Sequence, residues 1–451
     1  MQILKGMRYR VYLQEEQEEF LRQVSGCVRF VYNIGLEQRQ VFGCRDIPHH
    51  FGYAQQNKEL TKLKKEAPFL KDVPAQCLQS GLIDLQTSFD RFFNGISGYP
   101  TPRKRGENDG FRFPDPEQFW IEKIDDKKFV LLHLPKMGMR KTDHGPLKVR
   151  LHRPIQGEIR SVTLNHEADG VWYASFLCAV EIADPAVPLG KPTGVDRGVA
   201  VPIMDSEGNT PHVPVPTERQ KVRERRLKKA IARCDRKSNN RKRAVRALGR
   251  HTAKEARKRR DALHKATTQL AKNHSLVVFE DLRIKNMTAS AKGTIENPGV
   301  NVAQKSGLNR AILSVGWGMA SVMQGYKSVW YGSVFLKVPP MGTSQECSVC
   351  GHTDAASRVT RDLFCCTACG HTEHADLNAA KVIRDRGLKL LATPEDTDSG
   401  SACGSPLCQT RRRSTKQKSQ GRKPLHSCRG VVTQPVSAEV GIFSRQQHHH
   451  N

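Results

Sequence analysis

Four cysteines near the C-terminal end of the chain form two Cys-x-x-Cys pairs. They are Cys347, Cys350, Cys366 and Cys369, and Gly370 follows the last of them. Two such pairs separated by a short loop let four thiolates converge on one tetrahedral Zn²⁺. Four thiolates fill the coordination shell and leave no position for water. The spacing therefore predicts a zinc ribbon in which the metal is structural, not catalytic.

Other side chains near the two pairs leave alternatives for the zinc ligands. Cys365 adjoins Cys366, but only Cys366 repeats the Cys-x-x-Cys spacing with Cys369, so we favour Cys366. Three histidines could also replace a thiolate: His352, His371 and His374. The four cysteines remain the predicted ligands because they already complete the shell.

Three carboxylates stand where an acidic residue needs an explanation. Asp196 lies within an apolar strand pattern, Glu280 ends another, and Asp376 opens a helical pattern six residues beyond Gly370. Carboxylates are poor strand formers, and burying an unpaired one is costly. Each acid also has a plain alternative: a bulge or turn for Asp196, a solvated strand end for Glu280 and a helix N-cap for Asp376.

Taken together, the three acids favour a catalytic site. An Asp on a first strand, a Glu on a later strand and an Asp on a late helix match the layout of an RNase H-like nuclease. In such sites the acids bridge two Mg²⁺ ions roughly 3.5–4 Å apart, one activating water and one stabilising the leaving oxygen. Because the cysteine pairs lie between Glu280 and Asp376, we expect the ribbon to be an insertion in this nuclease domain.

The charge of the chain indicates a nucleic-acid partner. The formal net charge is +28, and residues 217–260 hold 20 Lys and Arg against 4 Asp and Glu, a net charge of +16. A solvated helix face usually mixes both signs, so this excess favours binding to a polyanion. No apolar run of roughly 18 residues and no signal peptide occur, and the cysteines outside the ribbon are scattered. These features favour a reducing cytoplasm and no membrane partner.

Hydrophobic patterns predict the elements that must hold these residues. A strand is expected at 8–13, followed by helices at 15–40 and 75–94 with apolar side chains at helical spacing. Short β-rich runs between 111 and 180 suggest a small barrel. After a proline-rich linker at 183–192, strands alternate with helices, as in an α/β fold.

The α/β part is predicted to contain three strands, at 193–204, 275–280 and 333–338. A long basic helical region is expected between the first two strands, and a helix at about 310–330 before the third. Residues 391–451 have no apolar period and are predicted to be mostly disordered.

Several motifs resemble the TnpB (OrfB zinc-ribbon) proteins of bacterial insertion sequences. They are Gly194-Val-Asp-Arg-Gly198, Val277-Val-Phe-Glu-Asp-Leu282, the ribbon run from Thr343 to Ala380, and Gly26-Cys-Val-Arg-Phe-Val-Tyr-Asn33 near the N-terminus. The resemblance covers about residues 1–390. It implies an RNA-guided DNA endonuclease that is related to the compact type V CRISPR effectors.

The resemblance also implies an α+β multidomain fold. The expected domains are a wedge β-barrel (1–13 and 110–182), an inserted helical recognition domain (14–109), an RNase H-like (RuvC-like) α/β nuclease domain (190–342 and 373–390), an inserted zinc ribbon (343–372) and a disordered tail (391–451).

By the same resemblance, Asp196, Glu280 and Asp376 are the catalytic acids that bind Mg²⁺, and the zinc is structural. The expected partners are a guide RNA from the element's right end and target double-stranded DNA, in a monomeric ribonucleoprotein of the bacterial cytoplasm, associated with the nucleoid. Gln76 and Gln79 match a helix that reads a short flanking DNA motif, since Gln can pair with adenine.

Three other functions use the same features. A transposase would join strands with the same acids, because RNase H-like sites support both chemistries. An accessory DNA-binding protein of the element would bind without cleaving. A compact type V CRISPR effector would cleave DNA, but it would be encoded beside a repeat array.

Overall fold

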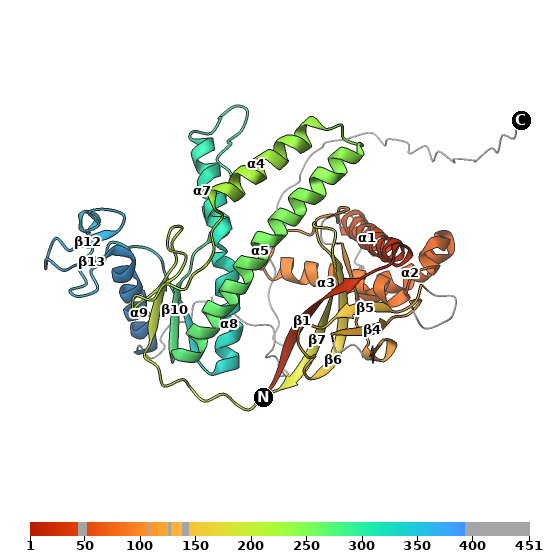
Figure 1. The fold of residues 1–451 in the computed structure, drawn as a ribbon, viewed down its shortest axis with the longest axis horizontal. Coiled ribbons are helices and arrows are strands. Elements are labelled where there is room, and N and C mark those ends of the chain that lie inside the picture. Colours follow the sequence, from red (N-terminus) through yellow and green to blue (C-terminus); the bar gives the residue numbers. More distant parts are fainter. Residues whose placement is uncertain (44–51, 107–108, 125–127, 138–143, 393–451) are drawn as a thin grey trace, which may run out of the picture. The chain divides into compact units, whose positions relative to one another are not determined.

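The structure, a computed structural model, describes residues 1–43, 52–106, 109–124, 128–137 and 144–392 (Figure 1). These residues contain a seven-stranded sheet, a four-stranded sheet and a two-stranded ribbon. The mixed α+β class predicted from the sequence is confirmed. None of the described helices has the length and apolar character needed to cross a membrane.

The seven-stranded sheet is antiparallel, in the order β2-β6-β7-β1-β5-β4-β3. Its end strands, β2 and β3, do not pair with each other in the described residues, so the closed barrel stays a prediction. The strands are β1 (Gln2–Tyr12), β2 (Gly110–Phe113), β3 (Trp120–Lys123), β4 (Phe129–His133), β5 (Leu147–Arg150), β6 (Glu158–His166) and β7 (Trp172–Glu181).

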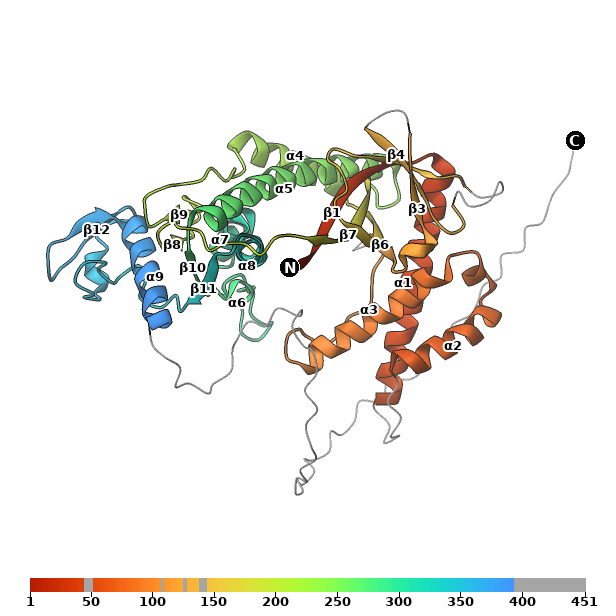
Figure 2. The same cartoon turned by 90° about the horizontal axis from the view of Figure 1, so that it is seen from below.

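Helices α1 (Glu15–Gly43), α2 (Tyr53–Glu66) and α3 (Ala75–Phe93) lie side by side in Figure 2. The apolar stripes of α1 and α3 share one core with the inner face of the seven-stranded sheet. The helices predicted at 15–40 and 75–94 are therefore confirmed, and their stripes are structural. Three short 3₁₀ helices also occur: Pro68–Lys71, Pro116–Gln118 and Ala355–Ser357.

The four-stranded sheet has the order β11-β10-β8-β9, in which β8, β10 and β11 are parallel. The strands are β8 (Thr193–Asp196), β9 (Met204–Asp205), β10 (Leu276–Glu280) and β11 (Val334–Val338). The helices of this part are α4 (Glu218–Arg233), α5 (Asn239–Asn273), α6 (Ile284–Met287), α7 (Val302–Val315), α8 (Trp317–Tyr331) and α9 (Ala375–Ala392). The ribbon strands are β12 (Leu363–Cys365) and β13 (Thr372–His374).

Strand β10 is buried on both faces, which explains its continuous apolar sequence. Val277 and Phe279 join a core with residues of α5 and α8. Leu276 and Val278 pack on the other face with Ile383 of α9. The sheet is therefore covered by α5 and α8 on one side and by α9 on the other, as Figure 1 shows.

Two predictions from the sequence are wrong in detail. The strand expected at 193–204 ends at Asp196, because the chain turns back where the Gly198 amide donates to the Val201 carbonyl (2.9 Å). The helix expected at 310–330 is two helices, α7 and α8, separated by Gly316 at φ +85°. The disordered segment predicted from 391 begins with the last two residues of α9, and the rest lies outside the described residues.

Helix α9 crosses β8 at a distance that excludes a side chain. A Cβ atom on Gly194 would lie 2.1 Å from the Ala380 carbonyl oxygen and 2.3 Å from the Arg384 amide nitrogen. Both contacts are with backbone atoms, which cannot rotate away. Gly387 of α9 lies against the Val278 side chain of β10, where an added Cβ would stand 2.3 Å from a methyl group.

Gly194→Ala is expected to lower the free energy of unfolding by about 1–3 kcal/mol, because the new methyl group forces α9 away from the sheet. Urea denaturation measures the loss. Gly6→Ala in β1 is the control, since no atom lies within 4 Å of the added Cβ, and its change should stay within about 0.5 kcal/mol. Equal changes in the two variants would contradict the close approach.

Candidate active site and metal-binding ribbon

The three predicted acids come from adjacent elements. Asp196 and Glu280 are the last residues of β8 and β10, which are neighbouring parallel strands, so their carboxyl groups lie at the same edge of the sheet. Asp376 is in the first turn of α9. Glu280 is only 8% exposed, so it is not a solvated strand end. The helix already begins at Ala375, so Asp376 is not its N-cap.

The electrostatics of Asp196 show that the other two acids lie close enough to act on it. Burial, and then the negative charges of Glu280 and Asp376, raise the pKa of Asp196 to about 7. The Arg197 amide and the Arg358 charge oppose this rise but do not cancel it. Within the described residues, the carboxylates do not form a metal-binding group as tight as that of the ribbon cysteines. Their all-oxygen donor set nevertheless has the chemistry that Mg²⁺ prefers.

Arg197 is a site residue that the sequence did not single out. Its buried guanidinium donates to the Glu280 backbone carbonyl and to the Trp317 carbonyl (3.3 Å), and it lies 4.9 Å from the centre of the Phe279 ring. The Trp317 indole in turn donates to the Gly198 carbonyl (3.2 Å). Arg197 therefore ties the ends of β8 and β10 to the start of α8 through its two terminal nitrogens, which donate to backbone carbonyls, while its Nε atom is buried without a partner.

A cavity of about 440 Å³ opens beside the acids. Asp196 and Asp376 line it together with Arg358 and Arg361, which belong to the ribbon insertion. A nitrogen of the Arg358 guanidinium lies 3.7 Å from an Asp376 carboxylate oxygen. The cavity thus places guanidinium groups against carboxylates, an arrangement that suits a phosphodiester held next to metal ions.

The ribbon brings the four predicted zinc ligands together. All four sulfur atoms lie within 4.8 Å of one another, and no histidine belongs to this group. The Sγ–Sγ distances are 3.7 Å for Cys347–Cys369 and 3.6 Å for Cys350–Cys366. Cys365 lies outside the group, and its sulfur accepts a hydrogen bond from the Thr372 hydroxyl (3.5 Å). The donor set and its geometry fit a tetrahedral zinc.

The ribbon is fastened to the elements that carry the acids. The buried Asn378 side chain, on α9, donates to the Glu346 carbonyl (2.7 Å) and accepts from the Ser348 amide (2.9 Å), inside the first cysteine pair. At the other acid, the Thr343 hydroxyl donates to a Glu280 carboxylate oxygen (2.6 Å). These contacts link the cysteine pair to both Asp376 and Glu280.

The structure places the two predicted DNA-reading glutamines on α3, one turn apart and partly buried. The Gln76 side-chain amide already donates to Asp115 (3.2 Å), which belongs to the loop after β2. Its oxygen is buried without a partner. Contact of Gln76 and Gln79 with DNA stays a prediction.

Three family models match parts of the chain. The model described as "Probable transposase" matches residues 175–291, and that of a Cas12f1-like TNB domain matches residues 317–383. A model described as a helix-turn-helix domain matches residues 1–41, which here form β1 and most of α1.

Two relatives match almost the whole chain. InsQ of Escherichia coli (strain K12), whose name describes an RNA-guided DNA endonuclease, is 35% identical over 406 residues, or 89% of this chain and 96% of InsQ. The chain belongs to the TnpB (OrfB zinc-ribbon) family. A relative from Streptomyces pristinaespiralis, also named as an RNA-guided DNA endonuclease, is 29% identical over 437 residues, or 95% of this chain and 98% of that one.

The fold of this TnpB-family protein is also found in a solved structure. A cryo-EM structure of a Cas12f1–sgRNA–target DNA complex aligns with a TM-score of 0.51, covering 83% of each chain at 15% identity. At this identity the likeness concerns the fold alone.

Replacing one thiolate is expected to empty the zinc site of this TnpB-family protein. Cys347→Ser or Cys369→Ser should lower the zinc content from one ion per chain to none and destabilise the ribbon, because a structural metal contributes its binding energy to folding. Elemental analysis and thermal melting measure both effects. Cys365→Ser is the matched control and should keep its zinc. Loss of zinc in that variant would contradict the ligand assignment.

Asn378→Ala is expected to lower the free energy of unfolding by about 1–3 kcal/mol, because it leaves two partly buried backbone groups, the Glu346 carbonyl and the Ser348 amide, without their partner. Chemical denaturation measures the loss. The variant should still bind one zinc ion, because no ligand is changed. Asn309→Ala is the control, since its side chain also bonds two backbone groups, both of them carbonyls, but only one of those contacts is partly buried. An Asn378→Ala loss no larger than the control would contradict the link.

Proposed function

We propose that this protein is an RNA-guided DNA endonuclease encoded by a transposable element, which cleaves guide-matched double-stranded DNA beside a short flanking motif. The names of its relatives support the activity. The observation that carries it is the gathering of Asp196, Glu280 and Asp376 at one edge of the sheet, where burial, and then the charges of Glu280 and Asp376, raise the pKa of Asp196 to about 7. Acids held close against repulsion indicate a site for divalent cations.

Asp196, Glu280 and Asp376 are the proposed Mg²⁺ ligands and catalytic residues. When bound, Mg²⁺ generates the nucleophile from water and stabilises the charge on the leaving oxygen. The protein's own groups position the reaction. Thr343 orients the Glu280 carboxylate through its hydroxyl, and Arg358 stands beside Asp376, where its guanidinium suits the scissile phosphate.

The proposed domain layout follows the family. The seven-stranded sheet is the wedge domain (1–13 and 110–182), and α1 to α3 are the recognition domain (14–109). The four-stranded sheet with its helices is the RuvC-like nuclease domain (190–342 and 373–390). The ribbon (343–372) holds the structural zinc on four cysteines, as the close approach of their sulfur atoms supports.

The proposed partners are a guide RNA from the element's right end and the target duplex, in a monomeric ribonucleoprotein. The net charge of +16 over residues 217–260 supplies non-specific affinity for these polyanions. Base pairing selects the target, while α3 reads the flanking motif through Gln79. Gln76 reads it as well once its hydrogen bond to Asp115 is broken. Such a protein works in the bacterial cytoplasm, at the nucleoid.

A transposase is the second candidate, because one matching family model bears that description. The two functions differ in the DNA that they need. Purified protein loaded with guide RNA should cut a guide-matched duplex that lacks the element's ends. Cleavage that requires those ends, or strand joining between them, would favour the transposase.

Removing one acid is expected to abolish cleavage without weakening nucleic-acid binding. Asp196→Ala, Glu280→Ala or Asp376→Ala should each lower the cleavage rate at least about 10³-fold, because the acids act as one unit. Guide-RNA and target affinities should change less than about threefold, since Lys and Arg contacts supply them. Gel-based cleavage and filter binding measure the two effects.

The matched control is Asp385→Ala, which removes an acid from the same helix as Asp376. Asp385 pairs with its neighbour Arg384 (2.8 Å) and does not line the cavity. This variant should cleave at the wild-type rate. Full cleavage by any one variant of the three acids would remove that residue from the site.

A further inference from the structure

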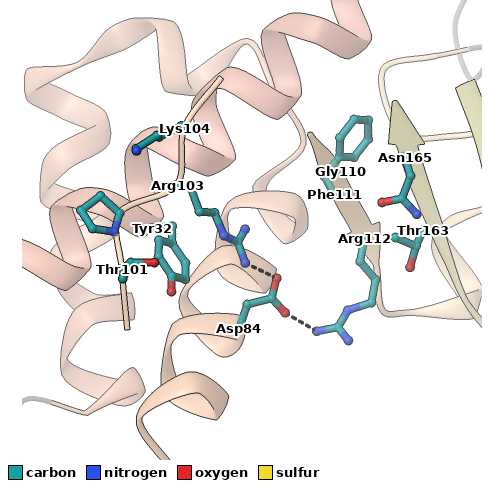
Figure 3. A pocket seen from close by; sticks show the side chains of 11 residues that line it. Tyr32, Asp84, Thr101, Arg103, Lys104, Gly110, Phe111, Arg112, Thr163 and Asn165 are labelled. Carbon is teal, nitrogen blue, oxygen red and sulfur yellow. Dashed lines mark hydrogen bonds and ion pairs between the residues drawn. The ribbon is translucent and has the colours of Figure 1, made fainter. Parts of the chain in front are cut away.

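A second polar cavity, of about 420 Å³, lies away from the acids in the N-terminal part of the chain (Figure 3). Its walls come from α1, α3, the segment 101–104, β2 and β6. This volume falls within the range of small-molecule sites and is large enough for one nucleotide. The proposed cleavage reaction gives this cavity no role.

Two guanidinium groups share one carboxylate in this cavity. An Arg103 nitrogen lies 2.9 Å from one oxygen of Asp84, and an Arg112 nitrogen lies 3.4 Å from the other. Figure 3 shows the two arginines approaching Asp84 from opposite sides. One negative charge therefore faces two positive ones. The cavity therefore keeps a net positive charge for an anion.

The Arg103 guanidinium is held in place before any ligand binds. The Asn33 side chain bonds both backbone groups of Arg103: its amide donates to the carbonyl (3.0 Å), and its oxygen accepts from the amide (2.8 Å). The guanidinium lies 4.0 Å from the centre of the Tyr32 ring. A cation fixed by its backbone and by a ring loses little entropy when an anion binds.

The opposite wall offers neutral hydrogen-bonding groups. Thr163 and Asn165 line it from β6, on the side of the cavity away from Tyr32 (Figure 3). Asn165 occupies the space that a side chain at Gly110 would need, since an added Cβ there would lie 2.1 Å from its Oδ1 atom. A hydroxyl and an amide suit a ribose or a base edge, which carry both donors and acceptors.

We propose that this cavity binds one nucleotide of the nucleic acid that the protein carries, with its phosphate on Arg103 and Arg112 and its sugar or base against Thr163 and Asn165. The inference rests on the proposed function only in that the protein must bind a guide RNA and a target DNA. Either strand can supply the phosphodiester, and the experiment separates the two sources.

The test compares Arg103→Gln and Arg112→Gln with Arg160→Gln. The control removes the same charge from β6, where Arg160 pairs with Glu158 (2.9 Å) outside the cavity. Losing one phosphate contact should weaken binding about five- to eightfold at 0.1 M salt and flatten the salt dependence by about 0.7–0.9 in log–log slope. The control should keep the wild-type affinity and slope.

Two affinities are measured for each variant: free protein for guide RNA, and the loaded ribonucleoprotein for target DNA. A loss in the first assigns the nucleotide to the RNA, and a loss in the second alone assigns it to the DNA. Thr101→Trp blocks the cavity from an exposed position without changing charge, so it should weaken the same affinity.

The proposal is overturned if the two cavity variants match Arg160→Gln, or if Thr101→Trp leaves both affinities unchanged. Thermal melting of each variant, with a midpoint equal to that of the wild type, shows that the fold is intact. Failure of the endonuclease itself has a different signature: wild-type protein would not cleave guide-matched DNA, whatever the cavity variants bind.

Discussion

The contact between α9 and β8 sets the position of almost everything else in the candidate active site. The helix backbone fills the space where a side chain at residue 194 would stand, and at Gly387 the contact repeats against Val278. Because backbone atoms meet directly, the helix has little freedom to slide or tilt. Asp376, in its first turn, therefore stays at the strand edge where Asp196 lies. At Gly194 and Gly387, the absence of a side chain is what allows this close approach.

The three acids lie near one another although their negative charges repel. Burial and the two neighbouring carboxylates raise the pKa of Asp196 to about 7, so the charged form of Asp196 is disfavoured in the protein alone. The terminal nitrogens of the buried Arg197 donate to the backbone carbonyls of Glu280 and Trp317 and not to the acid side chains. Its role is to lock two strand ends together. Arg358, beside Asp376, offsets part of the charge, and a divalent cation would offset the rest in the proposed metal-dependent mechanism.

The sequence predicted the parts of this site that depend on residue type and spacing. An acid within an apolar strand pattern is conspicuous because it breaks that pattern, and the two Cys-x-x-Cys pairs are conspicuous because they repeat one spacing. The residues that position them were not found, because their roles depend on contacts between distant segments. Thr343 shows nothing unusual until its hydroxyl meets Glu280. Asn378 reads as an ordinary helix residue until its amide meets the cysteine pair.

The errors in the predicted elements have a similar cause. Residues 197–204 are mostly apolar and match a strand pattern, but the chain turns back at Gly198, which meets Val201. The apolar pattern around Gly316 matches one long helix, and only the left-handed conformation at that residue divides it. Hydrophobic periodicity indicates which side chains are buried. The side chains stay apolar through the turn at Gly198 and through the division of the helix at Gly316. Where a glycine changes the direction of the chain inside a buried segment, the pattern cannot show it.

The position of the ribbon in the chain shows how a structural metal there would support the candidate active site. The insertion begins after β11 and ends at α9. It therefore connects β11, which pairs with the Glu280 strand β10, to the helix that carries Asp376. Thr343, at the start of the insertion, contacts Glu280. Arg358, in the middle of the insertion, lies beside Asp376. Structural zinc contributes about 10–16 kcal/mol of apparent binding free energy to a small domain. In a zinc-loaded ribbon, these contacts would let part of that free energy hold the three acids together against the repulsion of their charges.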